Sequence, residues 1–215
     1  MNSDDQKIDR MLQKDYQFKI GEYLGKGWQV LKQCFVPMVG FFLLTILINI
    51  VLSFVPILGQ IVFSLISAPL AAGYTFVVLA ILRDQPYTFS DFFKGISNKY
   101  FLQIFLISLV GGLLIALGYI FLLIPGLYLS ISYIFAIQLA IDYDLEFWDA
   151  LETSRKLVSK KWFSIFGLVL VLFVINIVGA LLLGIGLLVT LPLTVCTVIS
   201  AYDDIAGNTS KGRLI

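Results

Sequence analysis

Charged residues in this chain are gathered into four segments, separated by three long stretches that contain none. The 15 Lys and Arg and the 14 Asp and Glu lie in residues 4–32, 83–99, 142–161 and 203–213. The uncharged stretches hold 50, 42 and 41 residues: 33–82, 100–141 and 162–202. A membrane-spanning helix needs about 20 apolar residues. Each stretch is therefore long enough for two spans joined by a turn.

Proline or glycine stands near the middle of each uncharged stretch, at residues 56–59, 125–126 and 184–186. Both residue types interrupt helices. The pattern therefore predicts an all-α, polytopic membrane protein with six transmembrane helices arranged as three hairpins. The expected spans are residues 35–55, 60–82, 101–123, 127–142, 163–183 and 187–202.

The second helix of each expected hairpin carries small residues at intervals of about four. These are Ser64, Ala68, Ala72, Ser132, Ala136, Ala140, Thr190, Thr194, Thr197 and Ala201. Small residues allow membrane helices to approach closely. The second, fourth and sixth helices are therefore expected inside the bundle, with kinks at Pro69 and Pro192.

Each hairpin is preceded by a segment whose apolar residues recur with helical spacing. The first stripe includes Ile20, Leu24 and Leu31, and the third includes Leu151 and Val158. In the second segment, Thr88 and Asp91 have the spacing of a capping box. The pattern predicts three amphipathic helices on the cytoplasmic membrane surface. The alternative is that these segments are ordinary connectors packed on the bundle.

The ends of the three uncharged stretches resemble one another. LAILRD at 79–84, LAIDYD at 139–144 and SAYDDI at 200–205 align on alanines that are 60 and 61 residues apart. This similarity predicts one membrane domain of three degenerate repeats, unless apolar sequences resemble each other by chance. The repeats cover about 19–84, 85–144 and 145–206, between a polar N-terminal tail, 1–18, and a polar C-terminal tail, 207–215.

Composition and charge place the chain in a membrane and exclude several functions. Hydrophobic residues make up 59% of the chain and charged residues 13%, whereas about a quarter of a typical soluble domain is charged. A net charge of +1 offers no basic field for nucleic acid. The expected turns contain no Lys or Arg. The positive-inside rule therefore predicts that both termini are cytoplasmic.

The sequence offers little catalytic chemistry. It contains no His, the commonest general base and metal ligand. Cys34 and Cys196 have no metal-ligand spacing, so we expect packing roles for both thiols and no cofactor, metal or catalytic residue. The best enzymatic candidate is an acidic set that could hold Mg²⁺ against a lipid phosphate: Asp142, Asp144, Glu146, Asp203 and Asp204. The alternative reading is that these are helix caps and solvated charges.

Two groups of residues are candidates for binding. Possible contacts to lipid headgroups or a partner are Trp28, Lys32, Lys99, Arg155, Lys156, Lys160, Lys161 and Trp162. The strongest polar groups within the expected membrane segments are Asn49, Gln60, Gln103, Gln138 and Asn176. Polar side chains at this depth either line a path or form hydrogen bonds between helices.

The third charged segment also carries a family resemblance. It has an acidic start, then Ala150-Leu151, Ser154, a basic turn and Trp162-Phe163 before another apolar stretch. This pattern resembles small bacterial membrane proteins of unknown function, and is similar to the membrane domain of some bacterial glycerophosphodiester phosphodiesterases. The resemblance covers roughly residues 21–207. It implies a six-helix fold in a bacterial cytoplasmic membrane, and transfers no catalytic residue because these 215 residues include no soluble phosphodiesterase domain.

Taken together, the sequence favours a non-catalytic integral membrane protein that acts as a scaffold, an accessory subunit or a lipid-interacting protein. Its expected partners are membrane lipids, other membrane proteins or further copies of itself. The alternative is a channel or transporter for a small solute, with a path through the second, fourth and sixth helices.

Overall fold

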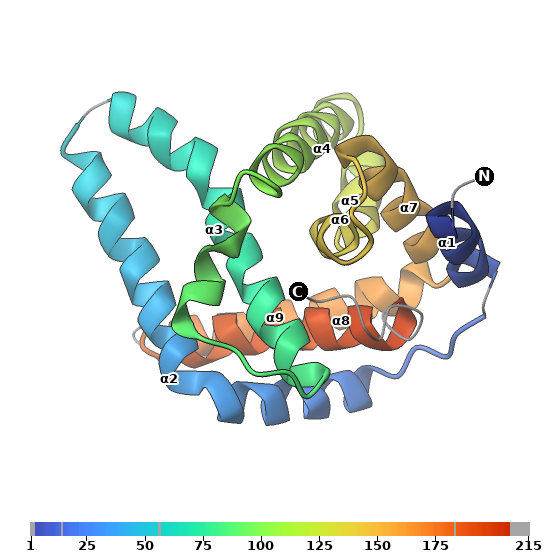
Figure 1. Cartoon of the computed structure of the whole chain (residues 1–215), viewed down its shortest axis with the longest axis horizontal. Coiled ribbons are helices and arrows are strands. Elements are labelled where there is room, and N and C mark those ends of the chain that lie inside the picture. Colours follow the sequence, from blue (N-terminus) through green and yellow to red (C-terminus); the bar gives the residue numbers. More distant parts are fainter. Residues whose placement is uncertain (1–2, 14, 56, 183, 207–215) are drawn as a thin grey trace.

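Six helices of the chain are long and apolar enough to cross a membrane in the computed structural model shown in Figure 1. The structure describes residues 3–13, 15–55, 57–182 and 184–206, so the expected C-terminal tail lies outside the described residues. Within these ranges every regular element is a helix. The elements are α1 (Ser3–Gln13), α2 (Ile20–Ser53), α3 (Leu58–Leu82), the 3₁₀ helix η1 (Phe89–Ile96), α4 (Phe101–Phe121), α5 (Leu123–Ser132), α6 (Ala136–Tyr143), α7 (Phe147–Ser159), α8 (Trp162–Leu181) and α9 (Leu187–Ile205). The prediction of an all-α protein with six helices of spanning length is confirmed.

The boundary between the third and fourth spans differs from the expected one. A single residue, Leu122, separates α4 from α5, and Pro125 and Gly126 lie in the first turn of α5 rather than between the helices. Proline is tolerated there because the first N–H groups of a helix have no intrahelical partner. Gly126 serves close packing instead. A Cβ on Gly118 of α4 would lie 2.8 Å from the Gly126 Cα atom.

Helix α2 contains both the first expected amphipathic segment and the first expected span. Its backbone leaves helical geometry at Cys34, with φ −125° and ψ 22°. Pro37 explains this position, because a proline ring clashes with the carbonyl four residues earlier and supplies no N–H to bond it. Helices α3 and α9 continue through Pro69 and Pro192, where kinks were expected.

The fourth span is interrupted between α5 and α6, and a side chain from α7 bridges the break. The Ser154 hydroxyl, which is fully buried, donates a hydrogen bond to the Ser132 carbonyl at 2.7 Å. It also accepts one from the Phe135 N–H at 3.2 Å. Backbone groups freed by a helix break need such partners when they are buried. The break and α7 therefore stabilise each other.

Replacing Ser154 by Ala should lower the free energy of unfolding by about 1–3 kcal/mol, because it leaves a buried backbone N–H without its partner. Unfolding by sodium dodecyl sulfate in mild-detergent micelles measures the loss. The matched control is Ser159→Ala on the same helix. The Ser159 hydroxyl makes only exposed hydrogen bonds and its removal leaves no buried group unpaired, so the change should stay below about 1 kcal/mol. Equal losses in the two variants would contradict this role for Ser154.

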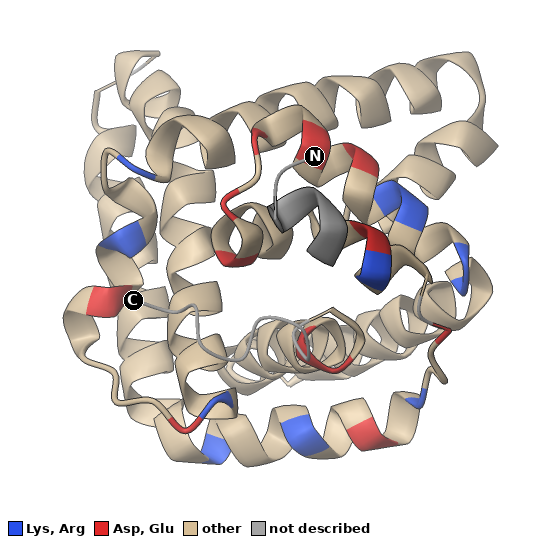
Figure 2. Cartoon of the chain, turned by 45° about the vertical axis from the view of Figure 1, so that its right-hand side comes forward, with Lys and Arg blue, Asp and Glu red and all other residues tan. Residues whose placement is uncertain are grey.

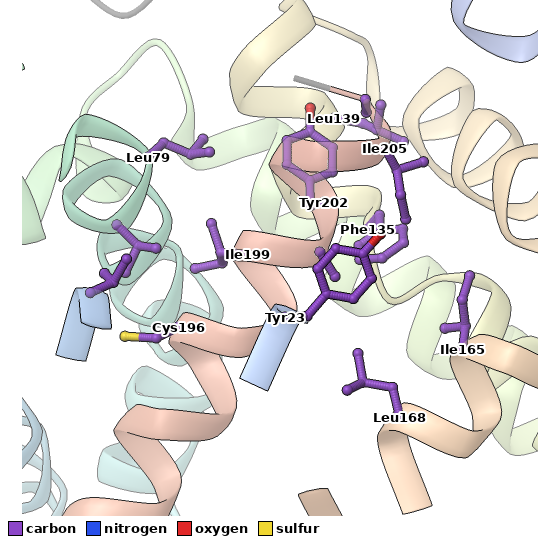
Figure 3. Close-up of a cluster of buried hydrophobic side chains, with 14 of the residues drawn as sticks. Tyr23, Leu79, Phe135, Leu139, Ile165, Leu168, Cys196, Ile199, Tyr202 and Ile205 are labelled. Carbon is purple, nitrogen blue, oxygen red and sulfur yellow. The ribbon is translucent and has the colours of Figure 1, made fainter. Parts of the chain in front are cut away.

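The second, fourth and sixth spans are more buried than the others. In their most apolar stretches, 56%, 50% and 44% of the residues are buried, against 11%, 22% and 22% in the first, third and fifth. The expectation that these spans form the inside is confirmed. Side chains from α2, α3, α6, α8 and α9 converge on one core, which includes Tyr23, Leu79, Leu139, Ile165 and Ile199 (Figure 3).

Large apolar side chains remain exposed after the end of α2, at the start of α5 and at the end of α8. Phe54 is 80% exposed, Ile124 79% and Leu181 77%. Contiguous apolar surface of this kind is typical of proteins that contact a membrane or a partner. The residues that α2, α3 and α9 contribute to the main core lie toward the other ends of these helices. They fall within residues 23–41, 70–79 and 196–205.

The segments between the spans also form helices. In η1 the Thr88 N–H donates to Asp91 Oδ2 at 2.8 Å, and the predicted capping box is present. Helix α7 buries Leu151 and leaves Trp148 55% exposed. Part of the N-terminal segment that we expected as a polar tail forms α1, where Met11 is buried against the main core.

Candidate functional site

The ends of α3, α6 and α9 each present one charged side chain to the others. Arg83 follows the last residue of α3, Asp142 lies in the last turn of α6, and Asp203 lies near the end of α9. The Arg83 Nη1 and Nη2 atoms donate to Oδ1 and Oδ2 of Asp142 at 2.7 and 2.9 Å. Its Nε donates to Asp203 Oδ1 at 3.1 Å. This bidentate geometry is the strong form of an arginine–carboxylate pair.

These charges are almost completely removed from solvent. The side chains of Arg83, Asp142 and Asp203 are 4%, 0% and 20% exposed. The hydroxyl of Tyr202, itself buried, donates to Asp142 Oδ2 at 2.9 Å. We call these four residues the Arg83 cluster. Buried charges persist only where they are paired and hydrogen-bonded, so the positions of the three helix ends depend on one another.

Helix dipoles explain why a cation is needed here. The C-terminal end of a helix carries partial negative charge, which disfavours a carboxylate and favours a cation. Asp142 and Asp203 both lie near such ends, and Arg83 compensates them. Burial alone would lower the pKa of Arg83, but the hydrogen bonds and charges of Asp142 and Asp203 outweigh it and hold the pKa above its usual value. The guanidinium is therefore charged at any physiological pH.

Additional bonds attach α2 and α6 to the end of α9. The Tyr23 hydroxyl donates to Asp204 Oδ2 at 2.8 Å, and Lys26 Nζ lies 3.7 Å from Asp204 Oδ1. The Tyr143 hydroxyl donates to the Ala206 carbonyl at 2.6 Å. Four of the spanning helices thus meet around two adjacent acids of α9.

The acids of the expected set form ion pairs or hydrogen bonds, or lie at the start of a helix. Asp142 and Asp203 bind Arg83, Asp204 binds Tyr23, and Asp144 lies 2.9 Å from Lys99 Nζ. Glu146 occupies the position that begins α7. Throughout the described parts of the chain, no three His, Cys, Asp or Glu side chains are placed to hold a metal ion. These contacts favour the structural alternative for the acids.

Candidate headgroup contacts lie at three separate places. Trp28 and Lys32 are exposed on α2, and Lys99 follows η1. The others lie on α7, between α7 and α8, and at the start of α8: Arg155, Lys156, Lys160, Lys161 and Trp162. Figure 2 colours the Lys and Arg residues of the chain blue and the Asp and Glu residues red.

Several of the basic side chains have protein partners. Arg155 and Lys156 pair with Glu152, Lys161 lies 3.5 Å from Asp15, and Lys160 donates to the Leu12 carbonyl. The indole N–H of Trp162 donates to the Tyr128 carbonyl at 3.3 Å. These contacts from residues 160–162 therefore help to hold α1 and α5 in place.

Two of the expected intramembrane polar residues join elements of the protein. Gln103 Oε1 accepts the N–H of Phe147 at 2.8 Å and so caps α7. Asn176 Nδ2 donates to Thr194 Oγ1 at 2.7 Å and joins α8 to α9. Asn49 is half-buried, and Gln60 is exposed. None of these four residues lines the cavity between the inner helices.

Gln138 is the one of the five that lines this cavity, which has a volume of about 450 Å³. Residues of α3, α4, α5, α6, α7 and α9 form its walls, and most of them are apolar or small. Gln138 is 9% exposed, and its Oε1 has no hydrogen-bond partner among the described residues. It lies one helical turn before Asp142, so the cavity and the Arg83 cluster are neighbours along α6.

Comparisons of the chain with protein-family models, with curated proteins and with solved structures gave no match. The likeness to the membrane domain of glycerophosphodiester phosphodiesterases therefore stays a prediction. The function has to be argued from the arrangement of the residues.

Proposed function

We propose that this chain is a non-catalytic, multi-pass protein of a bacterial cytoplasmic membrane that binds lipids and serves as a scaffold or accessory subunit. Its six helices cross the bilayer as three hairpins, with both termini and the charged segments on the cytoplasmic side. The observation that carries the non-catalytic assignment is the Arg83 cluster. Two of the five carboxylates that were the best candidates for chemistry, Asp142 and Asp203, are held there in contacts that join three helix ends.

The surface supports a role in lipid binding. Exposed apolar side chains cover the helices that we place against the acyl chains, and basic side chains lie on segments that we place at the headgroups. Lys32 and Lys156 are exposed. Exposed cations near a membrane surface each attract anionic lipid by about 1 kcal/mol.

Purification in mild detergent, followed by mass spectrometry of the lipids that remain bound, tests this function. The wild-type protein should retain anionic phospholipid. A Lys32→Gln variant should retain roughly fivefold less, as expected for the loss of one such cation. The control is Lys94→Gln, whose ammonium lies 3.0 Å from Asp91. A purified protein that retains no phospholipid, or that modifies lipid until Asp142→Asn abolishes the activity, would contradict the proposal.

The second candidate is a channel or transporter through the inner helices, and the cavity beside Gln138 favours it. A buried cluster of Phe76, Ile104 and Ile141 lies on the side of the cavity that faces Arg83. A conducting path would require this cluster to move. Ion or solute flux into liposomes that contain the purified protein alone would support this candidate.

A further inference from the structure

The cavity between the inner helices lies next to a smaller groove on the outer face of the bundle. This groove has a volume of about 370 Å³ and runs between α3 and α4, lined by Ser64, Leu65, Leu109 and Leu113 among others. The three leucines are 38%, 46% and 57% exposed, so the groove faces outward. In a membrane this surface meets acyl chains.

Ser108 and Gly112 of α4 line both the cavity and the groove. The wall between them therefore consists of small residues. A Cβ added to Gly112 would meet nothing within 4 Å. A chain of methylene groups in the groove could thus pass Gly112 and reach the inner helices.

Two properties of the cavity indicate the chemistry of its occupant. Walls that are mostly apolar favour an apolar guest, because the guest gains packing interactions with the atoms that line the cavity. Gln138 adds a buried amide oxygen without a partner among the described residues. Such an oxygen is costly to bury until a ligand donates a hydrogen bond to it. Ligand sites in proteins commonly have this composition and a volume of about 300–1,000 Å³.

We propose that the cavity binds a single-chain, uncharged lipid that enters sideways from the bilayer between α3 and α4 and donates a hydrogen bond from its hydroxyl group to Gln138 Oε1. A charged head is disfavoured, since no ionised side chain lines the cavity. This inference rests on the proposed function, because sideways entry requires the helices to lie in a bilayer.

The test uses photo-crosslinking in liposomes of phosphatidylethanolamine and phosphatidylglycerol that contain the full chain. The probe is a monoacylglycerol with a diazirine in its acyl chain. Crosslinks in the wild-type protein should map to cavity residues such as Ala72, Gln138 and Val198, as well as to the outer face of α8. A fatty acid with the same chain should label the cavity about fivefold less, which corresponds to about 1 kcal/mol.

Two variants separate entry from recognition. Gly112→Leu fills the passage and should lower crosslinking in the cavity about 10-fold, with labelling of α8 unchanged. Its control is Gly40→Leu, at an exposed α2 position that also has nothing within 4 Å of an added Cβ. Gln138→Leu removes the acceptor for the hydroxyl group and should lower cavity labelling by the monoacylglycerol about fivefold, as expected for the loss of one hydrogen bond of about 1 kcal/mol.

Labelling of α8 without labelling of the cavity in the wild-type protein would overturn the inference, as would cavity labelling that Gly112→Leu leaves intact. Equal labelling by the fatty acid would overturn the assignment of an uncharged head. In each of these cases, phospholipid that stays bound to the purified protein would still support the proposed lipid-binding function. Labelling of neither region would instead contradict the placement of the chain in the bilayer.

Discussion

Replacing Arg83 by Met should lower the free energy of unfolding by about 3–5 kcal/mol, the cost of removing one partner from a buried ion pair. The substitution removes the bidentate partner of Asp142, whose side chain is fully buried. It also leaves two carboxylates at the negative ends of helices without the cation that compensates them. Unfolding by sodium dodecyl sulfate in mild-detergent micelles measures the change.

A surface pair and a double variant show whether the loss arises from an uncompensated charge. Arg155→Met removes an arginine whose pair with Glu152 is partly exposed, and it should cost no more than about 1 kcal/mol. Arg83→Met combined with Asp142→Leu removes both buried charges and should recover most of the stability, as in other proteins where apolar residues replace a buried pair. A double variant as unstable as Arg83→Met would contradict the explanation.

Replacing Gly73 by Val should lower the free energy of unfolding by more than about 4 kcal/mol, in the range of severe core substitutions. A Cβ at this position would lie 1.8 Å from the Phe92 carbonyl oxygen, so η1 could not stay against α3. Phe92 is fully buried and stacks on Phe41 with ring centroids 4.7 Å apart. Moving η1 therefore also exposes an aromatic cluster.

Detergent unfolding again gives the measurement, and near-ultraviolet circular dichroism reports the aromatic cluster. The matched control is Gly40→Ala, where an added Cβ has open space. This control should be neutral or should stabilise the protein by up to about 1 kcal/mol, since alanine favours a helix more than glycine does. A Gly73→Val protein with wild-type stability and dichroism would show that η1 does not pack as described.

The spanning helices could be predicted because their signal is local. Twenty apolar residues without charge suffice to predict a span, and the spacing of small residues predicts which helices lie inside. The break between α5 and α6 has no such signal, because no proline or glycine lies at residues 133–135. It is explained by Ser154, which lies on a different helix and about 20 residues further along the chain.

The Arg83 cluster could be predicted only in part. The aligned ends of the uncharged stretches contain all three of its charged residues, but the predicted acidic set left the arginine out. Opposite charges at three similar helix ends were the signal that could have indicated pairing. Tyr202 and Tyr23 carried no signal, because the depth of a tyrosine hydroxyl depends on how the helices pack.

The six crossings and the cytoplasmic side of the charged segments can be tested by labelling single cysteines on intact cells with a charged, membrane-impermeant maleimide. Cys34 and Cys196 are fully buried and are first replaced by Ala. Cysteines at Phe54 and Ile185, between the paired helices, should react from outside. Cysteines at Lys32 and Lys156 should react only after the membrane is permeabilised. Labelling of Lys32→Cys or Lys156→Cys in intact cells would contradict six crossings with every charged segment inside.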